Sequence, residues 1–290
     1  MSKINIKELQ LSRKNLTDRY KTKHRTDLLN PTERNVYVQS RMPATQAVCE
    51  KVFSQIKKNG NITSILDLGC GSGSATYAAL KIFPSLSTIH LIDQHNYYEY
   101  DFSQPYQFFK QNFKDLNFSQ SYDLIVASYA INECDDKLVE NLLHYAWKYT
   151  NKYLVVIEPG TPHGYSAFLK ARQHLIDQGA FLMAPCPHEC ACPLVHPDWC
   201  HFKIRLHRTK IHQQIKQGTK SFEDESYIFG IFSKHQEQKT INRIIKKPIK
   251  KSGHILFNLC TPDGLENETV SRKDKIRYVK AKRLEWGDEF

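Results

Sequence analysis

The stretch Ile65-Leu-Asp-Leu-Gly-Cys-Gly-Ser-Gly-Ser-Ala-Thr-Tyr-Ala-Ala79 decides the fold of this chain. A short apolar strand runs into Gly69, Gly71 and Gly73, and a helix is expected directly after the last of them. Glycines let the backbone turn sharply and approach a ligand closely, with the first amides of the helix facing that ligand. A second apolar strand ends in Asp93, a place from which a carboxylate can accept both hydroxyls of a ribose. A glycine turn alone also occurs in α/β proteins for packing reasons.

Strands and helices alternate on both sides of this stretch. We expect strands at residues 122–127 and 153–157, and helices at residues 136–148 and 165–178. An amphipathic helix is expected from Pro43, ending near residue 60. Alternation of this kind predicts an α/β protein with a doubly wound, Rossmann-like parallel sheet.

Residues 186–200 hold a second conspicuous pattern, because Cys186, Cys190, Cys192 and Cys200 stand among four prolines. Prolines fix φ and prevent a continuous helix or central strand, so another force must hold this loop. Thiolates gathered on a metal would do so, and the distant Cys260 could supply a further ligand.

Two other interpretations of the cysteines are available. Free cysteines are often small buried apolar residues, and disulfides are a second alternative that the lack of a secretory signal disfavours. Zinc and an iron–sulfur cluster both accept four thiolates, so ligand type does not separate them. His188, His196 and His201 keep a mixed Cys/His zinc site open.

Beyond Cys200 the pattern becomes β-rich, with strands expected at residues 202–206, 227–232 and 254–259. We therefore divide the chain into a helical N-terminal extension (1–60), a cofactor-binding domain (61–183) and a cysteine-containing, basic C-terminal region (184–290). The net charge of +11 favours a polyanionic partner. The predicted RNA contacts in the C-terminal region are Lys203, Arg205, Arg243, Lys246, Lys247, Lys250 and Lys251.

The composition also limits where the protein works. The chain is 290 residues long and 40% hydrophobic, and it contains no apolar run of the length that crosses a membrane. The first residues lack the apolar segment of a signal peptide. We expect a cytoplasmic protein, or one of the mitochondrial matrix if its source is eukaryotic.

The form Asp-Leu-Gly-x-Gly-x-Gly resembles motif I of class I S-adenosylmethionine-dependent methyltransferases. The resemblance implies that the backbone of Gly69, Gly71 and Gly73 forms the wall against the methionine half of S-adenosylmethionine, and that Asp67 also belongs to the cofactor site. It also implies that Asp93 binds the ribose, and that Ser128 and Asn132, after the fourth strand, lie beside the transferable methyl group.

Further stretches resemble the small-ribosomal-subunit Rsm-type methyltransferase-like family over most of the chain from about residue 30. They include Arg41-Met-Pro-Ala-Thr45, Ile157-Glu-Pro-Gly-Thr-Pro162, the cysteine loop, Asp198-Trp-Cys-His-Phe202 and Trp286-Gly-Asp288. The resemblance implies a [4Fe–4S] cluster bound by Cys186, Cys192, Cys200 and Cys260, with zinc as the alternative. Cys190 stands at a position that is not a ligand in the family pattern.

The family resemblance implies a protein that assembles the small ribosomal subunit, binds its rRNA and is monomeric off the ribosome. The segment after the fourth strand lacks the Asn/Asp-Pro-Pro-aromatic motif that positions the amino groups of bases, and no general base or nucleophile is evident. Methylation of rRNA and a non-catalytic role in assembly, with a structural metal site, therefore both remain hypotheses.

Overall fold

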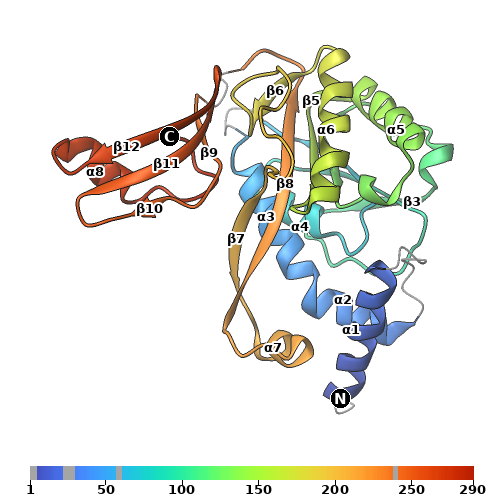
Figure 1. The fold of residues 1–290 in the computed structure, drawn as a ribbon. Coiled ribbons are helices and arrows are strands. Elements are labelled where there is room, and N and C mark those ends of the chain that lie inside the picture. Colours follow the sequence, from blue (N-terminus) through green and yellow to red (C-terminus); the bar gives the residue numbers. More distant parts are fainter. Residues whose placement is uncertain (1–4, 22–29, 57–60, 238–240) are drawn as a thin grey trace.

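The predicted glycine stretch forms the first strand of the main sheet and the turn into its first helix. The computed structural model describes residues 5–21, 30–56, 61–237 and 241–290 (Figure 1). Five parallel strands run side by side in the order β3-β2-β1-β4-β5. They are β1 (Ser64–Leu68), β2 (Thr88–Asp93), β3 (Tyr106–Lys110), β4 (Tyr122–Ser128) and β5 (Thr150–Pro159).

Three further strands complete this sheet, and of these only β8 runs antiparallel to the first five. The long strand β8 (Phe222–Ser233) lies between β5 and β6 (Phe181–Ala184), and β7 (Phe202–His207) pairs with the first half of β8. The strands expected at 202–206 and 227–232 are thus real, but they belong to the main sheet and not to a separate extension. The reason is burial: the second half of β8 is buried throughout and needs neighbours on both edges. The division of the chain at residue 183 stays a prediction.

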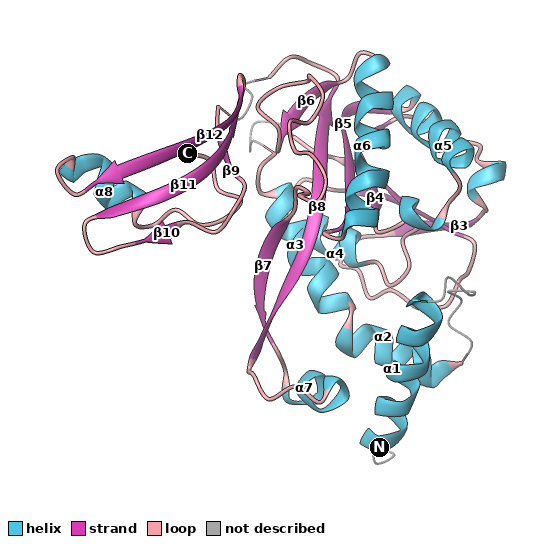
Figure 2. Ribbon diagram, viewed as in Figure 1, coloured by secondary structure: helices cyan, strands magenta, loops and turns pink. Residues whose placement is uncertain are grey.

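Helices cover both faces of the main sheet, as the alternating pattern predicts. Helix α3 (Met42–Phe53) packs on α4 (Ser74–Ile82) behind the sheet, and α5 (Asp136–Lys148) packs beside α6 (Pro162–Asp177) in front of it (Figure 2). Each front helix begins at a side-chain cap, Asp135 for α5 and Thr161 for α6. The doubly wound arrangement is therefore confirmed.

The N-terminal extension is helical and packs on the helix that connects β7 to β8. Its helices α1 (Ile6–Lys21) and α2 (Pro31–Ser40) meet α7 (Lys210–Lys216), which connects β7 to β8. Leu9, Val36 and Ile215, one from each helix, form a small apolar core. Residues 57–60, the predicted end of the extension, lie outside the described residues.

A second, small sheet follows the main one and has its own apolar core. Its strands are β9 (Arg243–Ile244), β10 (Ile249–Lys250), β11 (His254–Thr261) and β12 (Gly264–Ser271), followed by helix α8 (Lys275–Ala281). Ile255, Phe257 and Leu259 alternate along β11 and face this core. Two single-turn 3₁₀ helices, η1 (Phe113–Asp115) and η2 (Ile131–Glu133), complete the described elements. None of the described helices is both long and apolar enough to cross a membrane.

Candidate functional site

The glycine turn adopts a backbone that only glycine adopts without strain. Gly69, Gly71 and Gly73 have φ of 69°, 49° and 76°, all in the left-handed region. A Cβ on Gly69 would stand 2.9 Å from the Cβ of Ala130, and one on Gly73 would stand 3.0 Å from Phe102. The turn is therefore fixed both by its conformation and by what packs against it.

Asp93 lies where the sequence places it and holds the glycine turn. Its Oδ2 accepts a hydrogen bond from the amide of Gly71 at 3.0 Å, and its Oδ1 accepts one from the amide of His95 at 3.0 Å. Asp67 lies beneath the turn, almost fully buried, and its carboxylate accepts a hydrogen bond from Thr76 Oγ1 at 2.8 Å. Burial raises the pKa of Asp67 to about 7. Asp93 is thus hydrogen-bonded to the turn itself, and Asp67 to the helix that follows the turn.

Ser128 and Asn132, the two residues predicted to lie near the methyl group, have different surroundings in the structure. Ser128 ends β4, and its hydroxyl lies 3.5 Å from the thiol of Cys49 on α3. Next to it, Tyr129 has a φ of 58°, which is strained for a residue with a side chain. Asn132, in η2, instead lines a separate pocket between α5 and α6. The structure thus keeps Ser128 at the strand edge and places Asn132 toward the front helices.

Tyr100 is a residue of the glycine site that the sequence analysis missed. Its hydroxyl donates a hydrogen bond to the carbonyl of Gly71 at 2.7 Å, and its ring stacks on Phe102. The same hydroxyl lies 3.4 Å from the thiol of Cys70. An aromatic-rich run at residues 97–102, where a helix would ordinarily follow the second strand, is the signal that could have revealed it.

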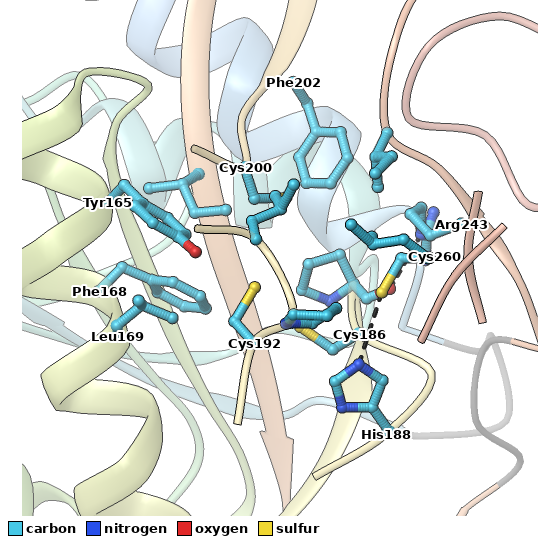
Figure 3. A pocket seen from close by; sticks show the side chains of 16 residues that line it. Tyr165, Phe168, Leu169, Cys186, His188, Cys192, Cys200, Phe202, Arg243 and Cys260 are labelled. Atoms are coloured by element: carbon cyan, nitrogen blue, oxygen red, sulfur yellow. Dashed lines mark hydrogen bonds between the residues drawn. The ribbon is translucent and has the colours of Figure 1, made fainter. Parts of the chain in front are cut away.

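The cysteine pocket is the second candidate site. Cys186, Cys192, Cys200 and Cys260 line one pocket of about 440 Å³, including its opening to solvent (Figure 3). The first three come from the loop between β6 and β7, and Cys260 comes from the end of β11 in the small sheet. Cys190 is exposed and does not line the pocket. The four family-pattern positions are therefore brought together, and Cys190 is left outside.

The pocket thiols influence one another electrostatically. Burial, followed by the charges of Cys186, Cys192 and Cys260, raises the pKa of Cys200 well above its ordinary value. Burial also raises the pKa of Cys260 to about 12, again with contributions from Cys186 and Cys192. Burial raises the pKa of Cys186 as well, so the thiols of Cys186, Cys200 and Cys260 resist ionisation unless a cation stabilises the thiolates.

Histidines contribute little to this pocket. Only His188 lines it among the histidines of the described residues, with Nε2 at 3.5 Å from Cys260 Sγ. His201 instead packs edge-on against Trp286. Within the described ranges, no three His, Cys, Asp or Glu side chains stand close enough together to hold a single metal ion.

A buried arginine beside this pocket indicates whether a negatively charged metal group would fit there. Arg172, on α6, is 2% exposed and donates hydrogen bonds to the carbonyls of His188 at 2.9 Å and Cys190 at 2.8 Å. It also interacts with the thiol of Cys186, whereas its Nε has no hydrogen-bond partner. In the described part of the chain it forms no ion pair with a carboxylate. A buried cation without a counter-charge is costly, so the pocket fits a group that turns the thiols into thiolates.

The predicted RNA-contacting residues have mixed surroundings. Arg205 forms a bidentate pair with Asp224 at 2.7 and 2.9 Å, and Lys246 pairs with Asp198 at 3.0 Å. Lys250 pairs with Glu285, Lys203 lies over the ring of Trp286, and Lys247 and Lys251 are exposed.

The prediction for Arg243 needs correction. This side chain is 3% exposed and donates hydrogen bonds to the carbonyls of Pro185 at 3.1 Å and Gly287 at 2.7 Å. Buried backbone carbonyls need a donor, and Arg243 supplies it between the cysteine loop and the C-terminal segment. It therefore has a structural position beside the cysteine pocket and does not face an RNA phosphate.

Five parallel strands in the order β3-β2-β1-β4-β5, an antiparallel strand β8 between β5 and a sixth parallel strand β6, a glycine turn after β1 and an acid at the end of β2 define the class I methyltransferase fold. Within this class the particular family is also shown. The model of the family described as mitochondrial small ribosomal subunit Rsm22 matches residues 31–290, and the chain belongs to that family.

Curated relatives match most of this chain. The human protein named ribosome assembly protein METTL17, mitochondrial, is 25% identical over 87% of this chain and 61% of its own length. The Rsm22-cox11 tandem protein 2, mitochondrial, of Schizosaccharomyces pombe is 25% identical over 88% of this chain and 42% of its own length. In Saccharomyces cerevisiae, ribosome assembly protein RSM22, mitochondrial, is 23% identical over 59% of this chain and 44% of its own length. The chain spans less than two thirds of the length of these relatives.

Solved structures similar to this one include methyltransferases of distant sequence. The plantazolicin methyltransferase BpumL in complex with SAH has a TM-score of 0.45 at 15% identity and covers 79% of this chain and 98% of its own. The RNA methyltransferase homologue PH1948 from Pyrococcus horikoshii has a TM-score of 0.43 at 15% identity, covering 81% and 98% of the two chains.

Proposed function

We propose that this protein assembles the small subunit of the mitochondrial ribosome by binding its rRNA. The observation that carries the proposal is the match of the Rsm22 family model over residues 31–290, together with the names of the human and yeast relatives. The net charge of +11 supports a polyanionic partner. The relatives' names support the mitochondrial matrix and give no support to the cytoplasm. We further propose that the protein is a monomer off the ribosome.

The proposal includes S-adenosylmethionine at the glycine turn. The left-handed glycines leave room for close approach of the methionine half, and Asp93, already fixed by the amide of Gly71, would accept the ribose hydroxyls. Tyr100 holds the turn through its hydrogen bond to the carbonyl of Gly71, and Asp67 accepts a hydrogen bond from Thr76 in the helix that follows the turn. When bound, S-adenosylmethionine would supply an electrophilic methyl group.

The proposal also includes a metal group bound by Cys186, Cys192, Cys200 and Cys260. Thiolate ligands suit both a [4Fe–4S] cluster and zinc. We propose the cluster in preference to zinc because the resemblance of the cysteine pattern to the family implies it. Arg172 would balance part of the negative charge that four thiolates bring. Such a group would join the cysteine loop to β11 and thereby fix the small sheet beside the main one.

A second candidate function is assembly without methyl transfer, and the end of β4 favours it. A methyl acceptor needs orientation and, for most nucleophilic atoms, a nearby base. The hydroxyl of Ser128 contacts the thiol of Cys49. The guanidinium of Arg41 lies 5.2 Å from the centre of the Tyr129 ring. None of these groups is a strong base, so binding of the cofactor could serve stability alone.

The function is tested in two steps. The purified protein should bind fragments of small-subunit rRNA, with an affinity that falls steeply as salt rises. Cells that lack the protein should accumulate incomplete small subunits, and expression of the wild-type chain should restore them. Normal subunits in the deficient cells, together with no RNA binding, would refute the proposal. Labelled S-adenosylmethionine then separates the two candidates, because transfer of label to rRNA requires the enzyme.

A further inference from the structure

The outer end of the small sheet carries a surface of which the sequence analysis assigned only Lys251. The β10–β11 turn, the β12–α8 turn and α8 meet there, at the end of the sheet far from the main one (Figure 1). The amide of Arg272 donates a hydrogen bond to the carbonyl of Gly253 at 2.9 Å, and Lys250 Nζ donates one to the carbonyl of Lys282 at 3.0 Å. These contacts hold the two turns and the end of α8 together.

Five cations gather on this outer surface with little acid to neutralise them. We define it by the exposed side chains Lys251, Arg272, Lys273, Lys275 and Lys282. Within the described residues none of the five forms an ion pair.

The neighbouring carboxylates are engaged elsewhere. Asp274 caps α8 by accepting the amide of Arg277 at 3.0 Å, Glu268 pairs with the side chain of Arg277, and Glu285 pairs with Lys250. The outer surface therefore has an excess of positive charge.

An aromatic ring stands within this group of cations. The ring of Tyr278, half-buried on α8, has the guanidinium of Arg272 and the ammonium of Lys282 each 5.9 Å from its centre. Cations around an accessible aromatic ring are typical of proteins that contact phosphates and stack on an unpaired base.

The outer surface differs from the other basic segments of the chain. Arg205 and Lys246 are paired with aspartates, and Arg208 and Lys216 both bind Glu223. Paired cations of this kind must give up a partner before they bind a phosphate. In the part of the chain that the structure describes, none of the five outer-surface cations has a carboxylate partner to give up, and Arg272 alone of the five donates a hydrogen bond from its side chain, to the carbonyl of Ser252.

We propose that the outer surface binds the phosphates of folded RNA, with Tyr278 placed to stack on an unpaired base. The proposal rests on the proposed function and names the surface that performs its RNA binding. Exposed Ile276 and Val279 lie on the same helix and would suit a protein partner. The unpaired positive charge argues for RNA, because a polyanion gains from every one of the five cations.

The test compares two triple variants with equal loss of charge. Lys251→Gln, Lys273→Gln and Lys282→Gln remove three cations of the outer surface. The control variant carries Lys110→Gln, Lys114→Gln and Lys137→Gln, three exposed positions on the main domain. Binding of a small-subunit rRNA fragment is measured from low to high salt, and melting temperatures and metal content confirm that each variant is folded.

We expect the slope of log affinity against log salt to fall by about 2 to 3 for the outer-surface variant, because each of the three lost phosphate contacts releases roughly 0.7 to 1 counterion. The control variant should keep the wild-type slope. Tyr278→Ala should lower the affinity for an RNA with an unpaired loop by roughly tenfold, and by less for a fully paired duplex.

An outer-surface variant with the wild-type slope and affinity would overturn the inference. If such a variant binds RNA normally but no longer joins small-subunit particles, the inference is also overturned, because the surface would then contact a protein. A wild-type protein that binds no rRNA would refute the proposed function itself, so the two failures are distinguishable.

Discussion

Replacing Arg172 by methionine removes the buried cation beside the cysteine pocket and keeps an apolar side chain of similar reach. The guanidinium interacts with Cys186 and is 2% exposed. Two unit charges about 4 Å apart attract by roughly 4 kcal/mol at an effective dielectric constant of about 20. This is an upper bound, because the substitution also removes the cost of burying Arg172. We expect the protein to hold its metal group about 10- to 100-fold less tightly, the usual range for a residue that supports a ligand.

The assay is anaerobic purification followed by iron, sulfide and zinc analysis and the time course of metal release to a chelator. Arg172→Lys should give an intermediate result, because it keeps the charge and loses the fork that binds the carbonyls of His188 and Cys190. Arg205→Met is the matched control, since Arg205 is exposed and pairs with Asp224. Melting temperatures of the metal-free proteins separate lost metal affinity from lost folding.

The reasoning would be refuted by an Arg172→Met protein with wild-type metal content and release. In that case the two hydrogen bonds to backbone carbonyls would be the whole role of Arg172. A wild-type protein that holds neither iron nor zinc would instead remove the metal site from the proposed function.

Three further outcomes follow from the two sites. Gly73→Ala should lower the free energy of unfolding, measured in urea, by roughly 1–3 kcal/mol, because it adds a clash with Phe102 to a left-handed backbone. Gly179→Ala is the control, because Gly179 also has a positive φ but open space around it, and this variant should show the backbone cost alone. The free energy of unfolding should fall by up to about 4 kcal/mol between pH 4 and pH 7 on account of Asp67, whose pKa is raised to about 7 in the folded protein. In that window the unfolded chain has lost the proton that the folded chain keeps, so stability falls as pH rises and levels off above pH 7. Asp67→Asn should remove this slope, and an unchanged slope would contradict the burial argument. Cys192→Ser should lose the metal group and lower the melting temperature, whereas Cys190→Ser, an exposed thiol outside the pocket, should keep both; equal metal loss in the two variants would contradict the ligand assignment.

The local parts of the fold were predictable because short-range chemistry determines them. Helix α5 begins and ends where the sequence predicts, since Asp135 caps it and its apolar residues repeat at helical spacing. The hydrogen bond between Asp93 and the amide of Gly71 follows from the order of strand, glycine turn and strand. Each of these features depends on residues within one βαβ unit.

The remaining features depend on contacts that sequence spacing does not encode. Strand β8 reads as a strand from its residues, but its place between β5 and β6 depends on which distant edges are free. Arg243 looks like any exposed cation in a basic run, yet carbonyls from residues far along the chain bury it. Tyr100 likewise acts through a hydrogen bond to Gly71 across a loop of irregular backbone.

The position of β8 determines the order in which parts of this protein can fold during its synthesis. Strands β1 to β5 can pair as they emerge, whereas β6 has no neighbour until β8 has been synthesised. The cysteine loop leaves the ribosome during that interval, and Cys260 follows only after β8. The half of the protein that holds the glycine turn is thus ready first, and any metal must be delivered to a nearly finished chain.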